Sequence, residues 1–239
     1  MRALFALFTL ALPATAEPIT LVPYADLEPR LVTRVDFEDF PRRLSPGVQI
    51  DGIQRVEGAA MGERFQGQLI WQEDGFDRVG PLADAPLALA AGADGQNLSI
   101  SLIYQLSNQL QGLAPPGYPA INAEGEGAVA VLFDRDQFAL GFRVAAEPQP
   151  RDGAGRPGAM TVQFFTRDAR LIASMPVTLG WGRKAYGFVR AGEEPDIAGI
   201  TITNADPAGI AIDDLIFDHD LAIGWRDPNE YLGQIVRLR

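Results

Sequence analysis

The chain has 239 residues, of which 31 are acidic and 20 basic, and it contains one histidine and no cysteine. A formal net charge of −11 disfavours nucleic acids and anionic lipid surfaces as partners, because an acidic protein repels phosphate groups. The lack of cysteine excludes disulfides, thiolate metal sites and cysteine nucleophiles, while the length is sufficient to bury a core in one domain.

The first residues have the pattern of a secretory signal peptide. A positive charge at Arg2 is followed by the apolar stretch 3–12 and by the small residues Ala14-Thr15-Ala16. This order is typical of a cleaved export signal, and the stretch is too short to span a bilayer. We therefore expect a signal peptide over 1–16 and a mature protein that is periplasmic or secreted. No later stretch is apolar enough for a membrane span, so a protein that is not membrane-spanning is expected.

Short runs rich in β-branched and aromatic residues follow, separated by Gly, Pro, Asn and Asp, and this pattern is typical of strands. The predicted strands are Thr33–Asp39, Gly47–Gln54, Arg64–Trp71, Pro86–Ala90, Leu98–Tyr104, Gly127–Phe133, Phe138–Ala145, Ala159–Phe165, Leu171–Pro176, Ala185–Arg190, Ile197–Thr203 and Ile210–Phe217. Because helices that could provide parallel crossovers are missing from the pattern, the strands predict an all-β fold of two packed antiparallel sheets.

The segments between the predicted strands include two short polar turns and two long loops. The turn 134–137 is predicted to join the strands on its two sides in a hairpin, and the turn 167–170 to join another pair. Long loops rich in Pro and Gly, over 113–127 and 147–158, are expected at the rims of the sandwich, where binding residues usually lie.

One domain is expected, with an N-terminal arm over 17–34, the sandwich over 35–218 and a tail over 219–239. In the tail, Asp227-Pro228 has the pattern of a helix start, and an apolar stripe follows between residues 231 and 236. The sequence therefore predicts one short C-terminal helix.

Acidic residues lie within strand patterns near both ends of the sandwich. Asp36 and Glu38 alternate with apolar residues in the first predicted strand, and Asp213-Asp214 interrupts the last one. Burying a carboxylate is costly unless it meets a cation, a hydrogen-bond donor or solvent. Calcium takes six to eight oxygen ligands and suits carboxylates from both segments. Whether these acids bind a metal or only accept hydrogen bonds stays open.

Four motifs together resemble a known group of domains. They are D-F-E-D at 36–39, A-V-x-F-D at 130–134, V-x-F-F-x-x-D at 162–168, and the closing I-x-I-x-N and G-I-x-I-D-D-L-x-F within 200–217. Over roughly residues 33–218 they resemble jelly-roll domains of the carbohydrate-binding-module or galactose-binding-like type, as found in exported bacterial proteins sorted by a PEP-CTERM signal. The chain shows no PEP-CTERM anchor, so the resemblance does not extend to surface sorting.

The resemblance implies a jelly-roll sandwich in which a structural calcium joins the first and last strands. In this sequence the ion would be held by Asp36 or Glu38 and by Asp213 or Asp214. Sugar binding would also need exposed aromatic rings that contact the apolar faces of pyranoses. The candidates for this role are Tyr118, Trp181 and Trp71.

The pattern contains no catalytic constellation, and we therefore expect an exported non-catalytic binding or interaction domain. Its partner would be a glycan or another envelope protein. The alternative is a sandwich-fold glycoside hydrolase or polysaccharide lyase, which needs two carboxylates about 5–10 Å apart across a cleft. Candidates for that pair are Glu57, Glu63, Glu124 and Glu126.

Overall fold

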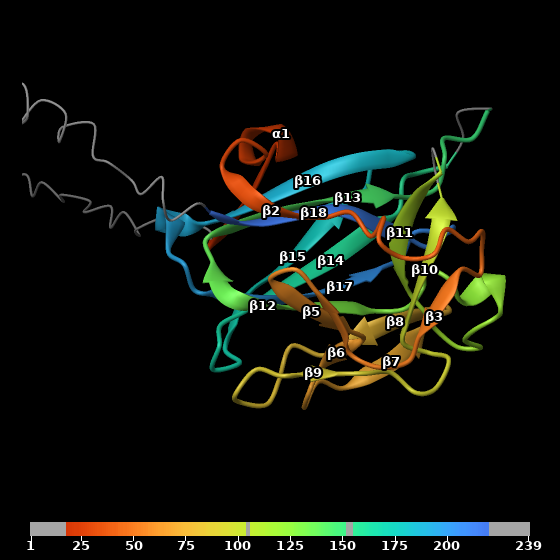
Figure 1. Cartoon of the computed structure of the whole chain (residues 1–239), viewed down its shortest axis with the longest axis horizontal. Helices are drawn as coiled ribbons and strands as arrows, with labels where there is room; N and C mark the ends of the chain where they lie inside the picture. Colours follow the sequence, from red (N-terminus) through yellow and green to blue (C-terminus); the bar gives the residue numbers. More distant parts are fainter. Residues whose placement is uncertain (1–17, 104–105, 152–154, 220–239) are drawn as a thin grey trace, which may run out of the picture.

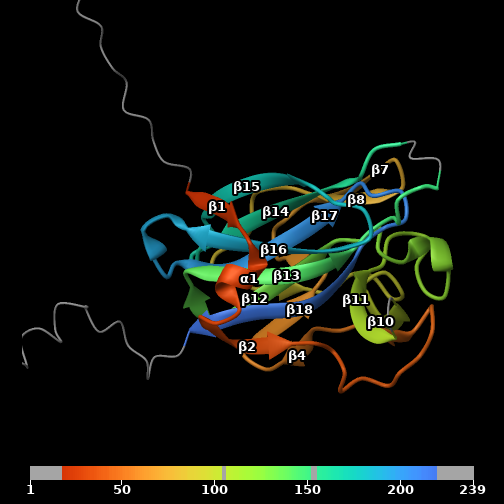
Figure 2. The same ribbon diagram turned by 90° about the horizontal axis from the view of Figure 1, so that it is seen from above.

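The computed structural model describes residues 18–103, 106–151 and 155–219. An eight-stranded and a six-stranded antiparallel sheet pack face to face as a β-sandwich, and two short two-stranded ladders lie beside them (Figures 1 and 2). The all-β, two-sheet prediction is confirmed. The predicted signal peptide and the predicted C-terminal helix lie outside the described residues. Among residues 18–103, 106–151 and 155–219, no helix has the length and apolar character needed to cross a membrane.

The strands of the larger sheet are, in pairing order, β1 (Ile19–Val22), β16 (Arg183–Arg190), β13 (Ala139–Ala145), β18 (Ala211–His219), β11 (Ser107–Gly112), β10 (Leu98–Ile103) and β3 (Val48–Ile50), with β2 (Leu31–Val35) paired to β18. Those of the smaller sheet are β15 (Leu171–Thr178), β14 (Ala159–Phe165), β17 (Ile197–Asn204), β12 (Val129–Gln137), β5 (Ala59–Gly62) and β4 (Gln54–Val56). The ladders are β6 (Arg64–Phe65) with β9 (Leu89–Ala90), and β7 (Ile70–Glu73) with β8 (Phe76–Val79). The short helices are α1 (Tyr24–Leu27), η1 (Ile121–Ala123) and η2 (Ala191–Glu193).

The main core lies between the two sheets and is built by alternate residues of each strand. Phe188 of the larger sheet joins the layers, because its ring centroid lies 5.5 Å from that of Phe142 and 5.4 Å from that of Phe164 in the opposite sheet. Burial of such rings is the main source of stability in a chain without disulfides.

Two smaller clusters cover the outer faces of the sandwich. Tyr24 and Leu27 of α1 pack on the outer face of the larger sheet. Phe65, in the segment 63–92, packs on the outer face of the smaller sheet, where its ring meets Phe165 edge to face at 5.4 Å. The molecule therefore has apolar layers outside both sheets in addition to the central core.

The expected N-terminal arm is instead part of the sandwich. β1 pairs along its whole length with β16, and α1 covers the sheet next to it. Strand β1 was not predicted from the sequence because Ile19–Val22 is only four residues long and is separated from the other strand patterns.

The hairpin predicted at 134–137 is wrong, whereas the one at 167–170 is confirmed by the pairing of β14 with β15. β12 pairs with β17 and β5 in the smaller sheet, and β13 pairs with β16 and β18 in the larger one, so the chain crosses between sheets at this turn. An alternating pattern on both sides of a turn identifies the buried faces but not whether the strands meet edge to edge or across the core.

The backbone at Gly127 lies so close to the backbone at Leu113 that a side chain at position 127 would clash. A Cβ on Gly127 would lie 2.3 Å from the backbone nitrogen of Leu113. We expect Gly127→Ala to lower the free energy of unfolding by about 1–3 kcal/mol, measured by urea denaturation. Gly52→Ala is the control, since its Cβ would meet nothing within 4 Å. Equal losses in both variants would contradict the close approach.

Candidate functional site

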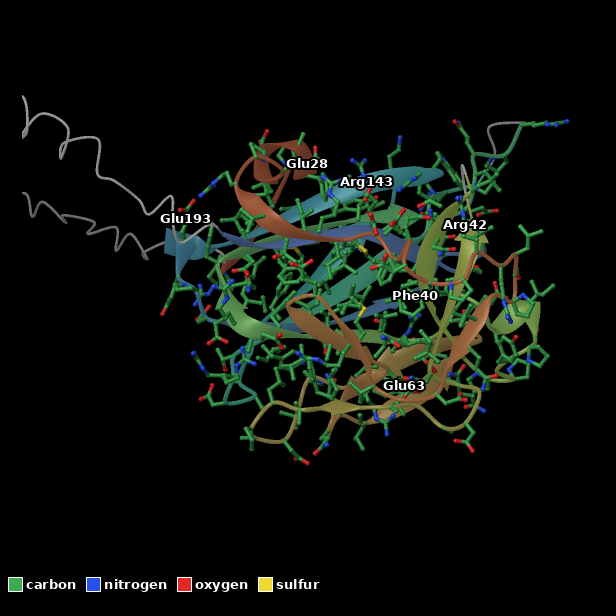
Figure 3. The ribbon with its side chains drawn as sticks, viewed as in Figure 1. Glu28, Phe40, Arg42, Glu63, Arg143 and Glu193 are labelled. Carbon is green, nitrogen blue, oxygen red and sulfur yellow. The ribbon has the colours of Figure 1, made fainter. Side chains whose placement is uncertain are left out.

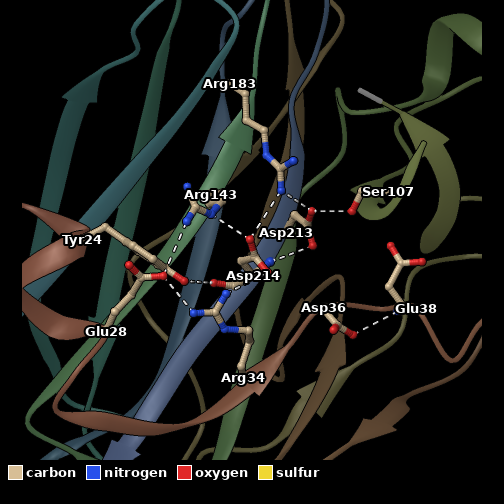
Figure 4. A network of polar contacts seen from close by, with 10 residues as sticks. All are labelled: Tyr24, Glu28, Arg34, Asp36, Glu38, Ser107, Arg143, Arg183, Asp213 and Asp214. Atoms are coloured by element: carbon tan, nitrogen blue, oxygen red, sulfur yellow. Dashed lines mark hydrogen bonds and ion pairs between the residues drawn. The ribbon is translucent and has the colours of Figure 1, made fainter. Parts of the chain in front are cut away.

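A network of charged side chains lies on the outer face of the larger sheet, where β2, β13 and β18 are neighbours (Figure 4). Asp214 is at its centre and accepts a hydrogen bond from Arg143 Nε at 2.7 Å, with Arg34 and Arg183 nitrogens each at 3.5 Å. β18 leaves the regular pleat here, with a register shift against β13 and a φ of +46° at Asp214. This irregularity brings both consecutive acids within reach of Arg183.

Asp213 is the most deeply buried member of the network, with 2% of its surface exposed. Its Oδ2 accepts a hydrogen bond from Ser107 Oγ at 2.8 Å and lies 2.5 Å from Arg183 Nη2. Burial raises the pKa of the Asp213 carboxyl to about 6, although both partners act in the opposite direction. Asp213 therefore has a cationic partner, and that partner is an arginine.

Tyr24 and Glu28 close the network on the side of α1. The Tyr24 hydroxyl donates to the backbone oxygen of Asp214 at 2.9 Å, and burial raises the pKa of this phenol to about 12, so it remains a donor at neutral pH. Arg143 lies over the Tyr24 ring at 4.9 Å, and Glu28 binds Arg34 at 2.8 Å. Each of the three arginines in the network is thus ion-paired with at least one acid.

The structure does not bring Asp36 and Glu38 into this network (Figure 4). Asp36 Oδ1 accepts from the backbone N–H of Glu38 at 3.2 Å, and Glu38 Oε1 accepts from that of Asn108 at 2.9 Å. Within the described ranges, no group of three or more His, Cys, Asp and Glu side chains is placed to hold a metal. In this arrangement the residues do not fit a calcium ion shared between the two ends of the sandwich. Calcium binding itself stays a prediction.

A cavity of about 300 Å³ lies between residues of β2 and β4, next to the network. Its apolar lining includes Val35, Phe37 and Phe40, and Arg34 is shared between the cavity and the network. Asn108, fully buried in β11, donates its side-chain amide to the backbone oxygens of Phe37 at 3.0 Å and Phe40 at 2.9 Å. These bonds hold the segment that forms the floor of the cavity.

Three carboxylates line the same cavity, those of Asp36, Asp39 and Glu57. Its two arginines are engaged elsewhere, because Arg34 binds Glu28 and Asp214, and Arg55 binds both oxygens of Asp134 at 3.0 Å. Among the described residues, the carboxylates of Asp39 and Glu57 have no hydrogen-bond or ion-pair partner. The cavity therefore offers free acceptor oxygens beside an apolar floor.

The three predicted aromatic residues lie at separate places. Trp71 is on the ladder strand β7 and is half exposed, Tyr118 is in the loop that binds the Gly95 backbone, and Trp181 is in the turn between β15 and β16. None of them lines the β2–β4 cavity. The aromatic residues at that cavity are instead Phe37, which the sequence pattern placed in the first predicted strand, and Phe40, which lies just beyond that strand.

The carboxylates proposed for an enzyme are also dispersed. Glu63 is buried beside Arg64 on the far side of the sandwich from Glu28 and Arg143 (Figure 3). Glu124 accepts from the Ser45 hydroxyl at 2.7 Å. Burial raises the pKa of Glu63, Glu124 and Glu126. Of the four candidates, Glu57 alone lines the β2–β4 cavity.

The chain matches no family model and no curated protein sequence. The resemblance to carbohydrate-binding jelly rolls is therefore supported at the level of the two-sheet antiparallel sandwich.

A pH titration tests the burial of Asp213. Because its folded-state pKa lies above the ordinary value of 3.8, the folded protein holds this proton more tightly than the unfolded chain. That stabilisation is complete below pH 3.8 and is lost as the pH rises through about 6. Relative to Asp213→Asn, the wild type should lose about 2–3 kcal/mol of unfolding free energy between pH 4 and pH 7, measured by urea denaturation. A difference that does not change with pH would contradict the raised pKa.

Proposed function

We propose that this chain is an exported, non-catalytic binding domain of the jelly-roll type that binds a glycan in the cavity between β2 and β4. The observation that carries the proposal is the pairing of free carboxylates, those of Asp39 and Glu57, with an apolar floor that contains Phe37 and Phe40. Carboxylate oxygens accept hydrogen bonds from sugar hydroxyls, and apolar side chains contact the C–H faces of sugar rings.

Charge favours a neutral glycan over an anionic one. The chain carries a net charge of −11, and both arginines at the cavity already bind acidic side chains. An anionic sugar would therefore meet free carboxylates without a free cation, which is unfavourable. Export rests on the signal-peptide pattern over 1–16, and the protein acts in the periplasm or outside the cell.

A glycan array of neutral and acidic oligosaccharides tests the proposal directly. We expect the labelled, purified protein to bind a subset of the neutral glycans, and binding to weaken in Phe40→Ala, which removes a ring from the floor. Binding of no glycan would reject this ligand class and would leave another envelope protein as the partner.

Calcium stays in the proposal only as the ion that the jelly-roll resemblance implies, with Asp36 or Glu38 as its ligand and without the Asp213–Asp214 pair. A ligand that binds only the folded state stabilises it by about 2.7 kcal/mol at a hundredfold excess over Kd. The melting temperature should therefore rise with calcium and fall with chelator, and the effect should be lost in Asp36→Asn but kept in Asp94→Asn, which changes an exposed acid away from the cavity. A melting temperature unaffected by both calcium and chelator would remove the ion from the proposal.

A glycoside hydrolase or polysaccharide lyase remains the second candidate. The observation that favours it is that Asp39 and Glu57 line one cavity from two different segments of the chain. Mass spectrometry of an array-positive oligosaccharide after incubation with the protein separates the two functions. Intact oligosaccharide supports binding alone, whereas cleavage that disappears in Glu57→Gln would establish the enzyme.

A further inference from the structure

The hairpin of β7 and β8 lies on the side of the sandwich opposite α1 (Figure 1). Asp77 and Val79 of β8 are buried, so one face of this hairpin is turned toward the protein. Residues alternate between the two faces of a ladder, and Leu69 and Trp71 therefore share the outward face. Their side chains are 76% and 51% exposed. Large apolar side chains that gather at one exposed place are typical of an interaction surface.

The outer edge of β7 is free to pair with another strand. Within the described ranges, β7 pairs with β8 alone. The Leu69 carbonyl accepts a hydrogen bond from the Gly80 N–H at 2.8 Å, which fixes the residues of β7 that point toward β8. Because bonded and non-bonded pairs alternate along an antiparallel ladder, the backbone groups of Ile70 and Gln72 point away from β8. No described group is hydrogen-bonded to them there.

The end strands of the smaller sheet show how such edges are usually protected. β15 contains Pro176, which has no N–H to offer, and the middle residue of β4 is the charged Arg55. β7 contains no proline, lysine or arginine, and it exposes Trp71 instead. An unprotected edge beside exposed apolar side chains is suited to accept an added strand.

The tip of the hairpin is acidic. Glu73 and Asp74 lie at the turn, and a Cβ on Gly75 would lie 3.9 Å from Glu126 Oε2. Arg78 binds Glu73 at 2.8 Å, whereas the carboxylates of Asp74 and Glu126 have no hydrogen-bond or ion-pair partner in the described part of the chain. Three carboxylates near one guanidinium favour a partner that brings a positive charge to the tip.

We propose that the edge of β7 is a docking site for an extended segment of a partner protein, which adds a strand to the hairpin. Its main chain bonds the free backbone groups of Ile70 and Gln72, and its apolar side chains contact Leu69 and Trp71. A lysine or arginine of the segment lies next to Asp74. A second copy of this chain is a poorer occupant, because each copy has a net charge of −11 and β7 has no basic residue. The site shares no residue with the β2–β4 cavity and does not depend on glycan binding.

Selection of a phage-displayed library of random peptides on the purified protein tests the proposal. We expect enrichment of peptides in which β-branched and polar residues alternate and which contain lysine or arginine. Fluorescence anisotropy then measures the affinity of the most enriched peptide. Trp71→Ala should weaken binding by about tenfold or more, whereas Val32→Ala, which removes an exposed apolar side chain from β2, should keep the wild-type affinity. Both positions are exposed, so folding should be retained in both variants.

Two N-methylated forms of the same peptide test main-chain pairing without any change in the protein. One form carries methyl groups on the odd-numbered backbone nitrogens and the other on the even-numbered ones. Only the nitrogens that face β7 donate to it, so one form should bind about tenfold or more weaker and the other nearly as well as the parent peptide.

Four outcomes would overturn the proposal. They are no enrichment of strand-like basic peptides, unchanged affinity in Trp71→Ala, and equal affinities of the two N-methylated forms. The fourth is a dimer of the wild type in sedimentation velocity that is lost in Trp71→Lys, which would assign this edge to a second copy of the chain.

Discussion

Replacing Arg183 with methionine is expected to lower the free energy of unfolding by about 3 kcal/mol at pH 7.5 and by about 1 kcal/mol at pH 5. Arg183 is the closest cationic partner of Asp213, whose carboxylate is almost fully buried. Without the guanidinium, an ionised carboxylate would remain buried with only the Ser107 hydroxyl and the neighbouring backbone to solvate it. At pH 5 the carboxyl, with its pKa of about 6, is mostly protonated, and most of the penalty is absent.

Urea denaturation at both pH values measures this effect, and Arg55→Met is its control. Arg55 also binds an acid at 3.0 Å, but both partners of that pair are largely exposed, so its loss should cost less than about 1 kcal/mol at either pH. Adding Asp213→Asn to Arg183→Met should recover most of the loss at pH 7.5. A loss in Arg183→Met that is equal at pH 5 and pH 7.5 would show that packing, and not charge, accounts for the effect.

The affinity for the proposed glycan ligand is expected to fall about 10- to 100-fold in Asp39→Asn and in Glu57→Gln. Each substitution replaces a charged acceptor that has no partner within the described residues and is therefore available to sugar hydroxyls. Because neither carboxylate has a partner to lose, the free energy of unfolding should change by no more than about 0.5 kcal/mol.

Titration calorimetry with an array-positive glycan provides the measurement, and Asp94→Asn is the control for the loss of one negative charge. Asp94 is exposed and does not line the cavity, so the Asp94→Asn variant should bind the glycan with the wild-type affinity. If all three variants bound equally well, the glycan would lie elsewhere on the protein.

Strand positions could be predicted wherever β-branched and aromatic residues alternate, as in Ala159–Phe165, which is β14 without change. The strand Ser107–Gly112 could not, because its residues have low β-propensity. It forms because Leu110 fills the core and Asn108 binds the 37–40 segment, and both are contacts distant in sequence.

The site was predictable only in part. Two adjacent acids in an apolar strand indicated that Asp213 and Asp214 need partners, and the structure provides them. The partners are Arg34, Arg143 and Arg183, which lie in three other strands. The strand register that places these arginines beside the two acids cannot be read from the sequence. An arginine within an otherwise apolar strand pattern is the signal that would have pointed to them.

The central claim is that a glycan binds between β2 and β4, and backbone amide chemical-shift mapping during a glycan titration tests it most directly. The account predicts that the largest shifts fall on residues 34–37, 39–40 and 54–57, which line the cavity. Shifts centred instead on Trp71, Tyr118 or Trp181, or no shifts with any glycan, would contradict it.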